Sequence, residues 1–204
     1  MIAALILAGG TSSRMKGIKQ LFSLGDEPML QRVVNTALRS QAEEVVVVLG
    51  YRADEIRAEV DFMKSKVVVC EDYATGMSAS LRTGVGALGD DVEAVVVLLA
   101  DQPLVSHGVL DALIEEYRRS NRRIVVPVSQ GLRRNPILID LTLRGEILRV
   151  EGDVGARSVL DEHEDEISPV EIPDASLFAD VDTRKDYLEV SRDLEARRAS
   201  RTDV

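Results

Sequence analysis

The sequence predicts an α/β protein in which an open, mostly parallel, doubly wound sheet forms a single domain. Three apolar runs carry this prediction: one ends at Ala8, and the others occupy residues 45–50 and 94–101. The runs are continuous and rich in β-branched residues, which is typical of parallel strands buried on both faces. Helical patterns separate them, so strands and helices alternate along the chain. A length of 204 residues suffices for one such domain with a substantial core.

The remaining elements follow from local patterns. A first helix is expected to begin near Pro28, which the first turn of a helix tolerates, because apolar residues between Leu30 and Leu38 recur at helical spacing. Ser106 is expected to cap a later helix. Further helices are expected over 52–60, 77–88, 107–119, 140–148, 154–163 and 184–199, and further strands over 66–70, 123–128 and 136–139.

The composition narrows the range of partners. The net charge of -10 argues against nucleic acid or an anionic membrane surface as a partner. The single cysteine, Cys70, excludes an intrachain disulfide and a multi-cysteine metal site, and we expect it in the core. No apolar run approaches the roughly 18 residues that mark a membrane-spanning helix, and no basic segment precedes the first run as in a signal peptide. We therefore expect a cytoplasmic protein.

Residues 5–20, LILAGGTSSRMKGIKQ, form the most informative stretch of the chain. A buried strand ends at two glycines, which let a ligand approach the backbone closely. Hydroxyl residues and three cations (Arg14, Lys16 and Lys19) follow without an acid between them. Such a loop suits a triphosphate held by backbone N–H groups and positive charge. It matches neither the dinucleotide fingerprint nor the Walker loop, and the alternative is a tight turn with solvated cations.

Ligands of doubly wound sheets bind at the carboxyl ends of the strands, so the residues after each strand are candidates for a site. Gly50, Glu71 and Asp101 occupy such positions. A carboxylate at a dry sheet edge is costly unless it is paired or binds a metal, so Asp101 is a candidate Mg²⁺ ligand beside phosphate oxygens. Its alternative role is a cap on the following turn.

A second candidate metal ligand, Asp182, lies in the segment ADVDTRKDY. Asp182 or Thr183 also makes a good helix N-cap, and Asp186 completes a capping-box pattern. Metal ligation and capping are both open at this position, and they can coexist through different carboxylate oxygens.

Three later segments suit substrate contacts. Residues 76–84, GMSASLRTG, place small side chains at the start of a helix, where a base or sugar can approach; the alternative is a helix start that merely packs closely. The polar segments at 134–136 and 152–157 suit an anionic second substrate.

Together these motifs resemble those of the molybdenum cofactor nucleotidyltransferases. The loop LAGGTSSRM with a lysine five residues after its arginine resembles the signature loop of that family, although Lys16-Gly17 departs from the commoner order, in which glycine directly follows methionine. GMSASL and ADQP look more like the cytidylyltransferase branch, whereas Ala8-Gly9-Gly10 is a form often seen in guanylyltransferases. The order and spacing of six motifs carry the resemblance: the loop at 7–19, GMSASL at 76–81, ADQP at 100–103, RNPILI at 134–139, GDVGAR at 152–157 and DVDT at 181–184.

The resemblance implies a nucleotide-diphospho-sugar-transferase-like, Rossmann-like domain over residues 1–190, with residues 191–204 as a helix end that frays. It implies Arg14, Lys19 and Asp101 as catalytic residues and Asp101 and Asp182 as Mg²⁺ ligands. The nucleotide is expected to contact Leu7, Ala8, Gly9, Gly10, Thr11, Ser12, Ser13, Arg14, Lys19, Gly50, Glu71, Gly76, Ser78 and Ser80. The acceptor is expected to contact Gln102, Arg134, Asn135, Gly152, Asp153 and Arg157.

The implied reaction is Mg²⁺-dependent transfer of CMP from CTP to the phosphate of a molybdopterin-type acceptor, with release of pyrophosphate; a molybdenum hydroxylase would receive the product. Transfer of GMP from GTP and transfer to another phosphorylated acceptor are the nearest alternatives. A dinucleotide-dependent oxidoreductase and a non-catalytic chaperone for molybdenum cofactor are alternatives of other classes.

Overall fold

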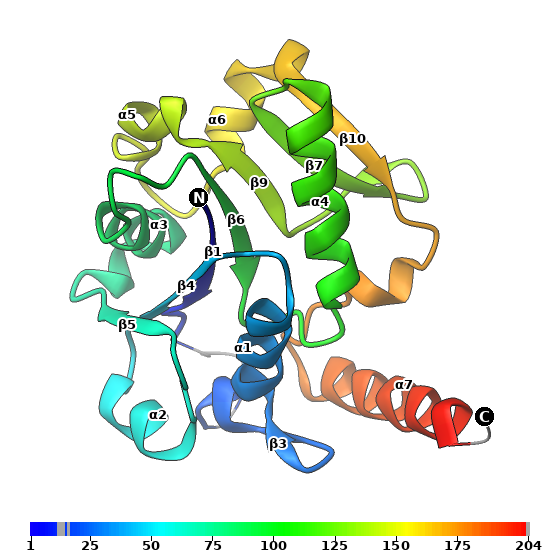
Figure 1. Cartoon of the computed structure of the whole chain (residues 1–204). Helices are drawn as coiled ribbons and strands as arrows, with labels where there is room; N and C mark the ends of the chain where they lie inside the picture. The colour runs from blue at the N-terminus through cyan, green and yellow to red at the C-terminus, as the bar shows by residue number, and fades with distance from the viewer. Residues whose placement is uncertain (12–14, 16, 203–204) are drawn as a thin grey trace.

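A predominantly parallel sheet runs through the centre of the protein (Figure 1). The computed structural model describes residues 1–11, 15 and 17–202, and within them the sheet has eight strands in the order β10-β7-β9-β6-β1-β4-β5, with β8 paired to β7. The strands are β1 (Ile2–Ala8), β4 (Glu44–Leu49), β5 (Lys66–Val69), β6 (Ala94–Leu99), β7 (Ile124–Ser129), β8 (Leu132–Arg133), β9 (Ile137–Asp140) and β10 (Ile167–Glu171).

The pairing confirms the open, mostly parallel sheet. Strand β1 pairs in parallel with both β4 and β6, β4 pairs in parallel with β5, and β10 pairs in parallel with β7. Strand β9 runs antiparallel to both of its neighbours, β6 and β7. Its first residue, Ile137, pairs with Val97. The residues that precede β9 therefore lie at the edge where β6 ends.

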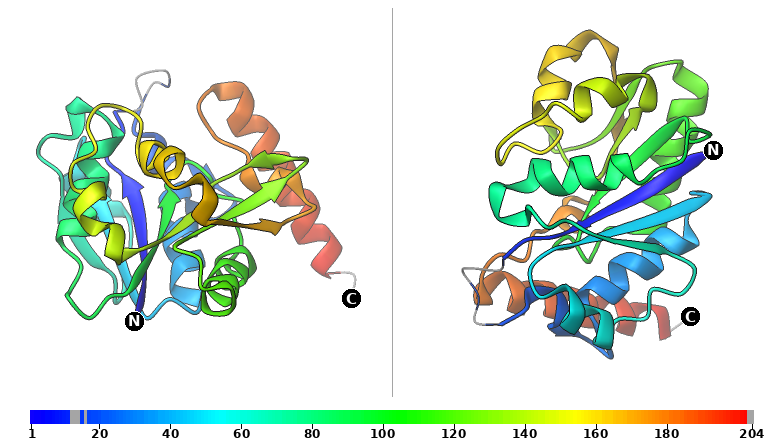
Figure 2. Two further views of the ribbon diagram at one scale, coloured as in Figure 1. Left: turned by 90° about the horizontal axis from the view of Figure 1, so that it is seen from above. Right: turned by 90° about the vertical axis from the view of Figure 1, so that its left-hand side faces the viewer.

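Helices cover both faces of the sheet, as the alternation of elements predicts (Figure 2). Successive side chains of β1 point to opposite faces, so Ile6 belongs to the core that includes residues of α1, α2 and α4, whereas Leu5 belongs to the core that includes residues of α3, α5 and α6. Cys70 is buried on the second face, as expected. The helices are α1 (Met29–Arg39), α2 (Ala53–Glu59), α3 (Met77–Gly86), α4 (His107–Ser120), α5 (Arg144–Ile147), α6 (Arg157–Glu162) and α7 (Arg184–Thr202).

Two predicted helices differ most from the structure. The range 140–148 divides into a 3-10 turn, Leu141–Leu143, and the single turn α5. The helix predicted from residue 154 begins only at Arg157, because Gly152 and Gly155 adopt positive φ angles of 76° and 57° and form a loop before it.

Two helix starts follow the sequence prediction only in part. Pro28 ends a short strand and occupies the N-cap position of α1, one residue before its first turn. Ser106 is the N-cap residue of α4, but its side chain makes no capping hydrogen bond. Three pairings were not predicted: the hairpin of β2 (Ser23–Leu24) with β3 (Glu27–Pro28), the short strand β8 beside β7, and the edge strand β10.

The C-terminal helix α7 packs beside the β2–β3 hairpin rather than on the sheet (Figure 1). Val190 and Leu194 on its inner side join Leu24 and Met29 in a small third core. Among the described residues, no helix combines the length and apolar character needed to cross a bilayer.

Candidate functional site

The glycine turn after β1 forms one wall of the site. Gly9 and Gly10 follow the last strand residue, Ala8, and both line a pocket of about 430 Å³. A Cβ atom at Gly9 would lie 2.5 Å from the Ser80 hydroxyl oxygen, which is a severe clash. A larger residue at position 9 would require the Ser80 hydroxyl to rotate away, because α3 packs directly against the turn.

A short 3-10 helix, η1 (Lys19–Leu21), places Lys19 opposite the end of β6. The Lys19 Nζ atom lies 3.0 Å from Oδ2 of Asp101 and 2.9 Å from Oδ1 of Asp182. Lys19 is the most enclosed of the three, with 13% of its side chain exposed, against 28% for Asp101 and 45% for Asp182. The two carboxylates therefore converge on one point at the edge of the pocket.

Asp182 reaches this point because its segment lies beside the end of β6. The Val181 N–H donates to the Asp101 carbonyl oxygen at 2.9 Å, and the Val181 side chain is fully buried. Thr183 rather than Asp182 caps α7: the Thr183 N–H donates to the Asp186 carboxylate, and the Asp186 N–H donates to the Thr183 hydroxyl. Because Thr183 and Asp186 together cap the helix, the Asp182 carboxylate does not act as the cap and points toward Lys19.

A third carboxylate, Asp180, adjoins the pair. It accepts a hydrogen bond of 2.9 Å from the Gln102 side-chain amide. Burial raises the pKa of Asp180, and the neighbouring charges of Asp101 and Asp182 raise it further. Burial alone would lower the pKa of Lys19, but the attraction of Asp101 and Asp182 outweighs it and the pKa of Lys19 is raised. The ammonium group is therefore the counter-ion that holds this acidic edge together.

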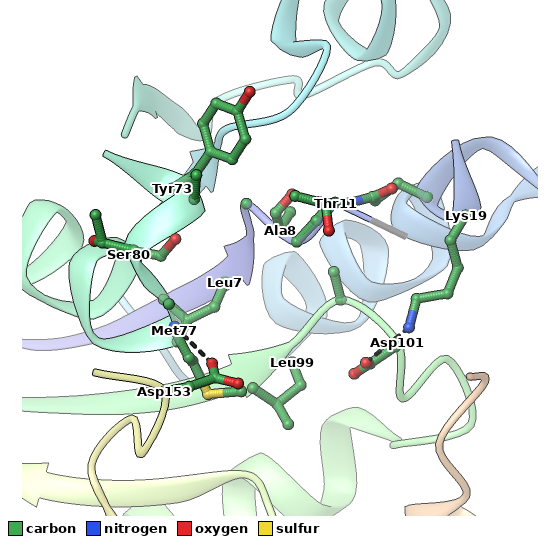
Figure 3. Close-up of a pocket in the computed structure, with 17 residues that line it drawn as sticks. Leu7, Ala8, Thr11, Lys19, Tyr73, Met77, Ser80, Leu99, Asp101 and Asp153 are labelled. Carbon is green, nitrogen blue, oxygen red and sulfur yellow. Dashed lines mark hydrogen bonds and ion pairs between the residues drawn. The ribbon is translucent and has the colours of Figure 1, made fainter. Parts of the chain in front are cut away.

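The opposite wall of the pocket comes from the segment between β5 and α3 (Figure 3). Tyr73 and Ser80 lie on this side, across from Lys19 and Asp101. The backbone N–H of Met77 donates to the Asp153 carboxylate at 2.9 Å, so the loop before α6 closes the pocket beside the start of α3. The pocket thus lies at the carboxyl ends of β1 and β6, the position at which open α/β sheets bind ligands.

Gly76, which has no side chain, allows the loop before α6 to pack closely against the start of α3. Its φ angle of +118° disfavours any other residue, and an added Cβ atom would lie 2.5 Å from the Gly152 carbonyl oxygen. That carbonyl accepts a hydrogen bond from the Ser78 N–H at 3.2 Å.

The structure brings most of the expected nucleotide contacts together and places others elsewhere. The pocket is lined by Leu7, Ala8, Gly9, Gly10, Thr11, Lys19, Gly76 and Ser80 from that set. Gly50 lies behind the glycine turn, Ser78 is fully buried, and Glu71 is exposed outside the pocket lining. Ser12, Ser13 and Arg14, together with Lys16, lie outside the described residues.

The expected acceptor contacts are divided in the same way. Asp153 lines the pocket, and the Gly152 carbonyl accepts a hydrogen bond from the start of α3. Gln102 is buried and bonded to Asp180. Arg134 and Asn135 precede β9 and so lie at the edge where β6 ends, while Arg157 is exposed at the start of α6.

The sequence analysis missed several residues of the pocket or its edge, among them Gln20, Tyr73, Met77 and Asp180. The alternation in residues 180–182, acid–valine–acid, is a period-two pattern that could have indicated two carboxylates on one side of an extended segment. No comparable pattern marks Gln20, which lies beside Lys19 but is directed under the glycine turn.

The donor set at the edge suits a hard divalent cation. Asp101 and Asp182 each bring a carboxylate oxygen within 3.0 Å of the same nitrogen atom, so both oxygens can reach one small ion. Carboxylate oxygens are the ligands that Mg²⁺ and Mn²⁺ prefer. A cation here, beside a glycine turn and a lysine, can hold the phosphate chain of a nucleotide.

This fold and pocket define a protein of the nucleotidyltransferase class. A family model described as the MobA-like NTP transferase domain matches residues 4–167. The chain belongs to that family, which confirms the resemblance seen in the sequence motifs.

A curated relative and two solved structures are similar to this chain over most of its length. The chain is 29% identical over 189 residues to nicotine blue oxidoreductase of Paenarthrobacter nicotinovorans, a match that covers 89% of this chain and 92% of that protein. The crystal structure of Rv0371c from Mycobacterium tuberculosis H37Rv is 26% identical, with a TM-score of 0.85 and coverage of 94% of this chain and 97% of that chain. A second crystal structure of Rv0371c is a complex with manganese (25% identity, TM-score 0.83, coverage of 94% and 97%).

A more distant solved structure shares the fold alone. Molybdopterin-guanine dinucleotide biosynthesis protein A from Archaeoglobus fulgidus is 15% identical, with a TM-score of 0.71 and coverage of 95% of this chain and 99% of that chain.

Proposed function

We propose that the protein transfers a nucleotidyl group, CMP from CTP in the first instance, to the terminal phosphate of a molybdopterin-type acceptor. In this reaction an acceptor phosphate oxygen forms a bond to the α-phosphorus, the bond between the α-phosphorus and the α–β bridging oxygen breaks, and pyrophosphate leaves. The acceptor phosphate is ionised near neutral pH and needs no general base. Positioning and charge stabilisation therefore supply the catalysis.

The observation that carries the proposal is the convergence of Lys19, Asp101 and Asp182 beside the glycine turn. Within this proposal Lys19 neutralises the β- and γ-phosphates and so stabilises the leaving pyrophosphate, and Arg14 shares that task. The turn amides receive phosphate oxygens. Gly76 and Ser80, on the facing wall, leave room for the sugar and base.

Asp101 and Asp182 would hold Mg²⁺, which supplies neutralisation of the phosphate charge when it is bound. The manganese complex of Rv0371c supports a divalent ion for this family fold. Because Lys19 pairs with both carboxylates, the ion and the ammonium group compete for the same oxygens. An incoming triphosphate relieves this competition, since it offers Lys19 new partners.

The acceptor is proposed to enter past the residues that precede β9. Arg134 and Asn135 lie at the pocket edge of the sheet and supply a cation and an amide for an anionic group, and Arg157 supplies a further cation at the start of α6. The resemblance of the sequence motifs to those of the molybdenum cofactor nucleotidyltransferases favours molybdopterin as the acceptor.

A substrate panel tests the proposal. Thermal shifts and pyrophosphate release are measured with CTP, GTP, ATP and UTP, each with Mg²⁺ and with molybdopterin, a sugar phosphate or phospholactate as acceptor. Release that requires molybdopterin together with CTP supports the proposal, and release with GTP instead assigns guanylyl transfer. Tight molybdopterin binding without pyrophosphate release for any nucleotide would identify a carrier rather than a transferase.

An oxidoreductase is the second candidate, because a relative over most of the chain carries that name. The same pocket would then hold the pyrophosphate of a nicotinamide dinucleotide. Binding of NADH or NADPH, with no Mg²⁺-dependent shift for any triphosphate, would favour this second function.

A further inference from the structure

The buried side chain of Gln20 donates hydrogen bonds to the backbone of the glycine turn. Only 3% of the residue is exposed. Its Nε2 atom donates to the carbonyl oxygen of Ala8 at 3.0 Å and to that of Gly10 at 3.2 Å. A side-chain amide nitrogen carries two hydrogens, so both bonds form at once. Gln20 therefore binds the carbonyl groups on either side of Gly9.

These two bonds fix the direction of two backbone N–H groups. Among the described residues the cis peptide bond is Asn135–Pro136, so the peptides of the turn are trans. In a planar trans peptide the C=O and the N–H point in opposite directions. Because the carbonyls of Ala8 and Gly10 point to Gln20, the N–H groups of Gly9 and Thr11 point away from it. Both of these residues line the pocket.

The same bonds change the charge that the turn presents. Carbonyl oxygens carry partial negative charge and would repel a phosphate, whereas backbone N–H groups attract one. Because Gln20 binds the carbonyls of Ala8 and Gly10, the turn presents N–H donors to the ligand. Gln20 and Lys19 are neighbours in η1, so one short element positions both the donors of the turn and the ammonium group at the carboxylates.

We propose that Gln20 is a positioning residue for the phosphate chain: it orients the glycine turn so that the turn amides receive phosphate oxygens. This proposal rests on nucleotide binding in the pocket, as in the proposed function. It assigns Gln20 no contact with the reacting atoms. It predicts that Gln20 contributes to the affinity for phosphate groups and not to the affinity for the base and ribose.

The test separates these two affinities by calorimetry. Gln20→Met removes both donors at similar volume, and Gln20→Glu places a carboxylate against the two carbonyls. We expect the Kd for tripolyphosphate with Mg²⁺, and that for CTP with Mg²⁺, to rise about tenfold in Gln20→Met, which corresponds to ~1.4 kcal/mol. Gln20→Glu should weaken both further, and the Kd for cytidine should change less than about twofold in either variant.

Gln31→Met is the matched control. The Gln31 side chain also makes two bonds to backbone, donating to the Asp61 carbonyl at 2.9 Å and accepting from the Asp61 N–H at 2.8 Å, but it lies on α1 outside the pocket lining. We expect it to lower the melting temperature without changing any of the three Kd values.

Two results would overturn the proposal. One is unchanged tripolyphosphate binding in Gln20→Met. The other is an equal loss of tripolyphosphate and cytidine affinity in both Gln20 variants, as a general loosening of the pocket would give. Failure of the wild-type protein to bind any triphosphate is a different result, because it would reject the proposed function itself.

Discussion

Two charged clusters lie at opposite edges of the sheet and differ in what surrounds them. At the carboxyl ends of β1 and β6, Lys19 is half-buried among Asp101, Asp180 and Asp182 beside a pocket. At the amino ends of β7 and β10, Arg123 pairs with Glu166, and His163 bonds to both Glu146 and Glu166. We call these the pocket cluster and the outer cluster.

Both clusters contain acidic and basic side chains, and they differ in the ratio of negative to positive groups. In the outer cluster two potential cations, Arg123 and His163, face two acids, Glu146 and Glu166. In the pocket cluster one lysine faces three carboxylates, so the cluster carries an excess of negative charge. An excess of carboxylates next to a cavity is an arrangement that a divalent cation can complete. The pocket cluster is therefore proposed to act in catalysis, and the outer cluster to act in stability.

The largest expected effect is that of Asp101→Asn. The substitution keeps the size of the side chain and removes one negative charge, so Mg²⁺-dependent pyrophosphate release should fall by about a hundredfold to a thousandfold, comparable to the loss of one preorganised group. Steady-state assays measure this, and the melting temperature should stay close to that of the parent.

Glu166→Gln is the matched control at the outer cluster, since it removes one carboxylate charge from the other edge. Its turnover should equal that of the parent. Equal losses in both variants would remove the distinction between the two clusters.

Lys19→Met is expected to act in two opposite directions. Turnover should fall about a hundredfold, because a cation beside the leaving pyrophosphate is lost. Binding of Mn²⁺ alone should strengthen about tenfold, equivalent to ~1.4 kcal/mol, because the competing ammonium is gone from Asp101 and Asp182. Titration of Mn²⁺ by electron paramagnetic resonance without nucleotide measures the second effect.

Arg123→Met serves as the control, because it removes a cation from the outer cluster. It should leave Mn²⁺ binding at the pocket unchanged. Weaker Mn²⁺ binding in Lys19→Met would contradict the assignment of Asp101 and Asp182 as cation ligands.

A smaller effect is expected for Arg134→Gln. If Arg134 meets the anionic acceptor, its loss should raise the KM for the acceptor about tenfold, equivalent to ~1.4 kcal/mol, and leave the KM for CTP unchanged. A change in the KM for CTP alone would instead place Arg134 with the nucleotide.

The smallest effect belongs to His163 in the outer cluster. The hydrogen bond to Glu146, and then that to Glu166, raises the pKa of His163 above its ordinary value of 6.5. A raised folded-state pKa stabilises the protein below pH 6.5, and that contribution is lost as pH rises through the folded-state pKa. The difference in unfolding free energy between the parent and His163→Gln should therefore be largest at acidic pH and disappear at alkaline pH.

The measurement is urea unfolding from pH 5.5 to 9. Proton resonances can follow the same titration, because the chain has two histidines and His107→Gln identifies which signal is which. A stability difference that grows with pH would contradict the assignment of the ion pairs.

Much of the fold was predictable because parallel strands buried on both faces read as continuous apolar runs, as β1, β4 and β6 do. Strand β10 was missed because it lies at an edge, carries Pro169 and has no fully buried residue. The hairpin of β2 with β3 was missed because each strand has two residues, too few for any periodic pattern.

The meeting of Lys19 with Asp101 was predictable in the same way, since both follow strands that end at one edge. The position of Asp182 was not, because it depends on the route of the chain from β10 back to β6. Its capping alternative was settled by Thr183, whose side chain caps α7 instead. Gln20 could not be found, because a glutamine that bonds to backbone carbonyls leaves no trace in the sequence pattern.

The match to the family model stops at residue 167. The segment that follows β10 and brings Val181 to the end of β6 therefore lies outside the match. A fragment trimmed to that boundary would retain the glycine turn, Lys19 and Asp101, but it would lack Asp182 and the small core beneath α7. Cleavage between β10 and Val181, followed by loss of the tail, would have the same result. Under the proposed function, that loss would take one carboxylate from the pocket cluster and abolish turnover while most of the sheet remained.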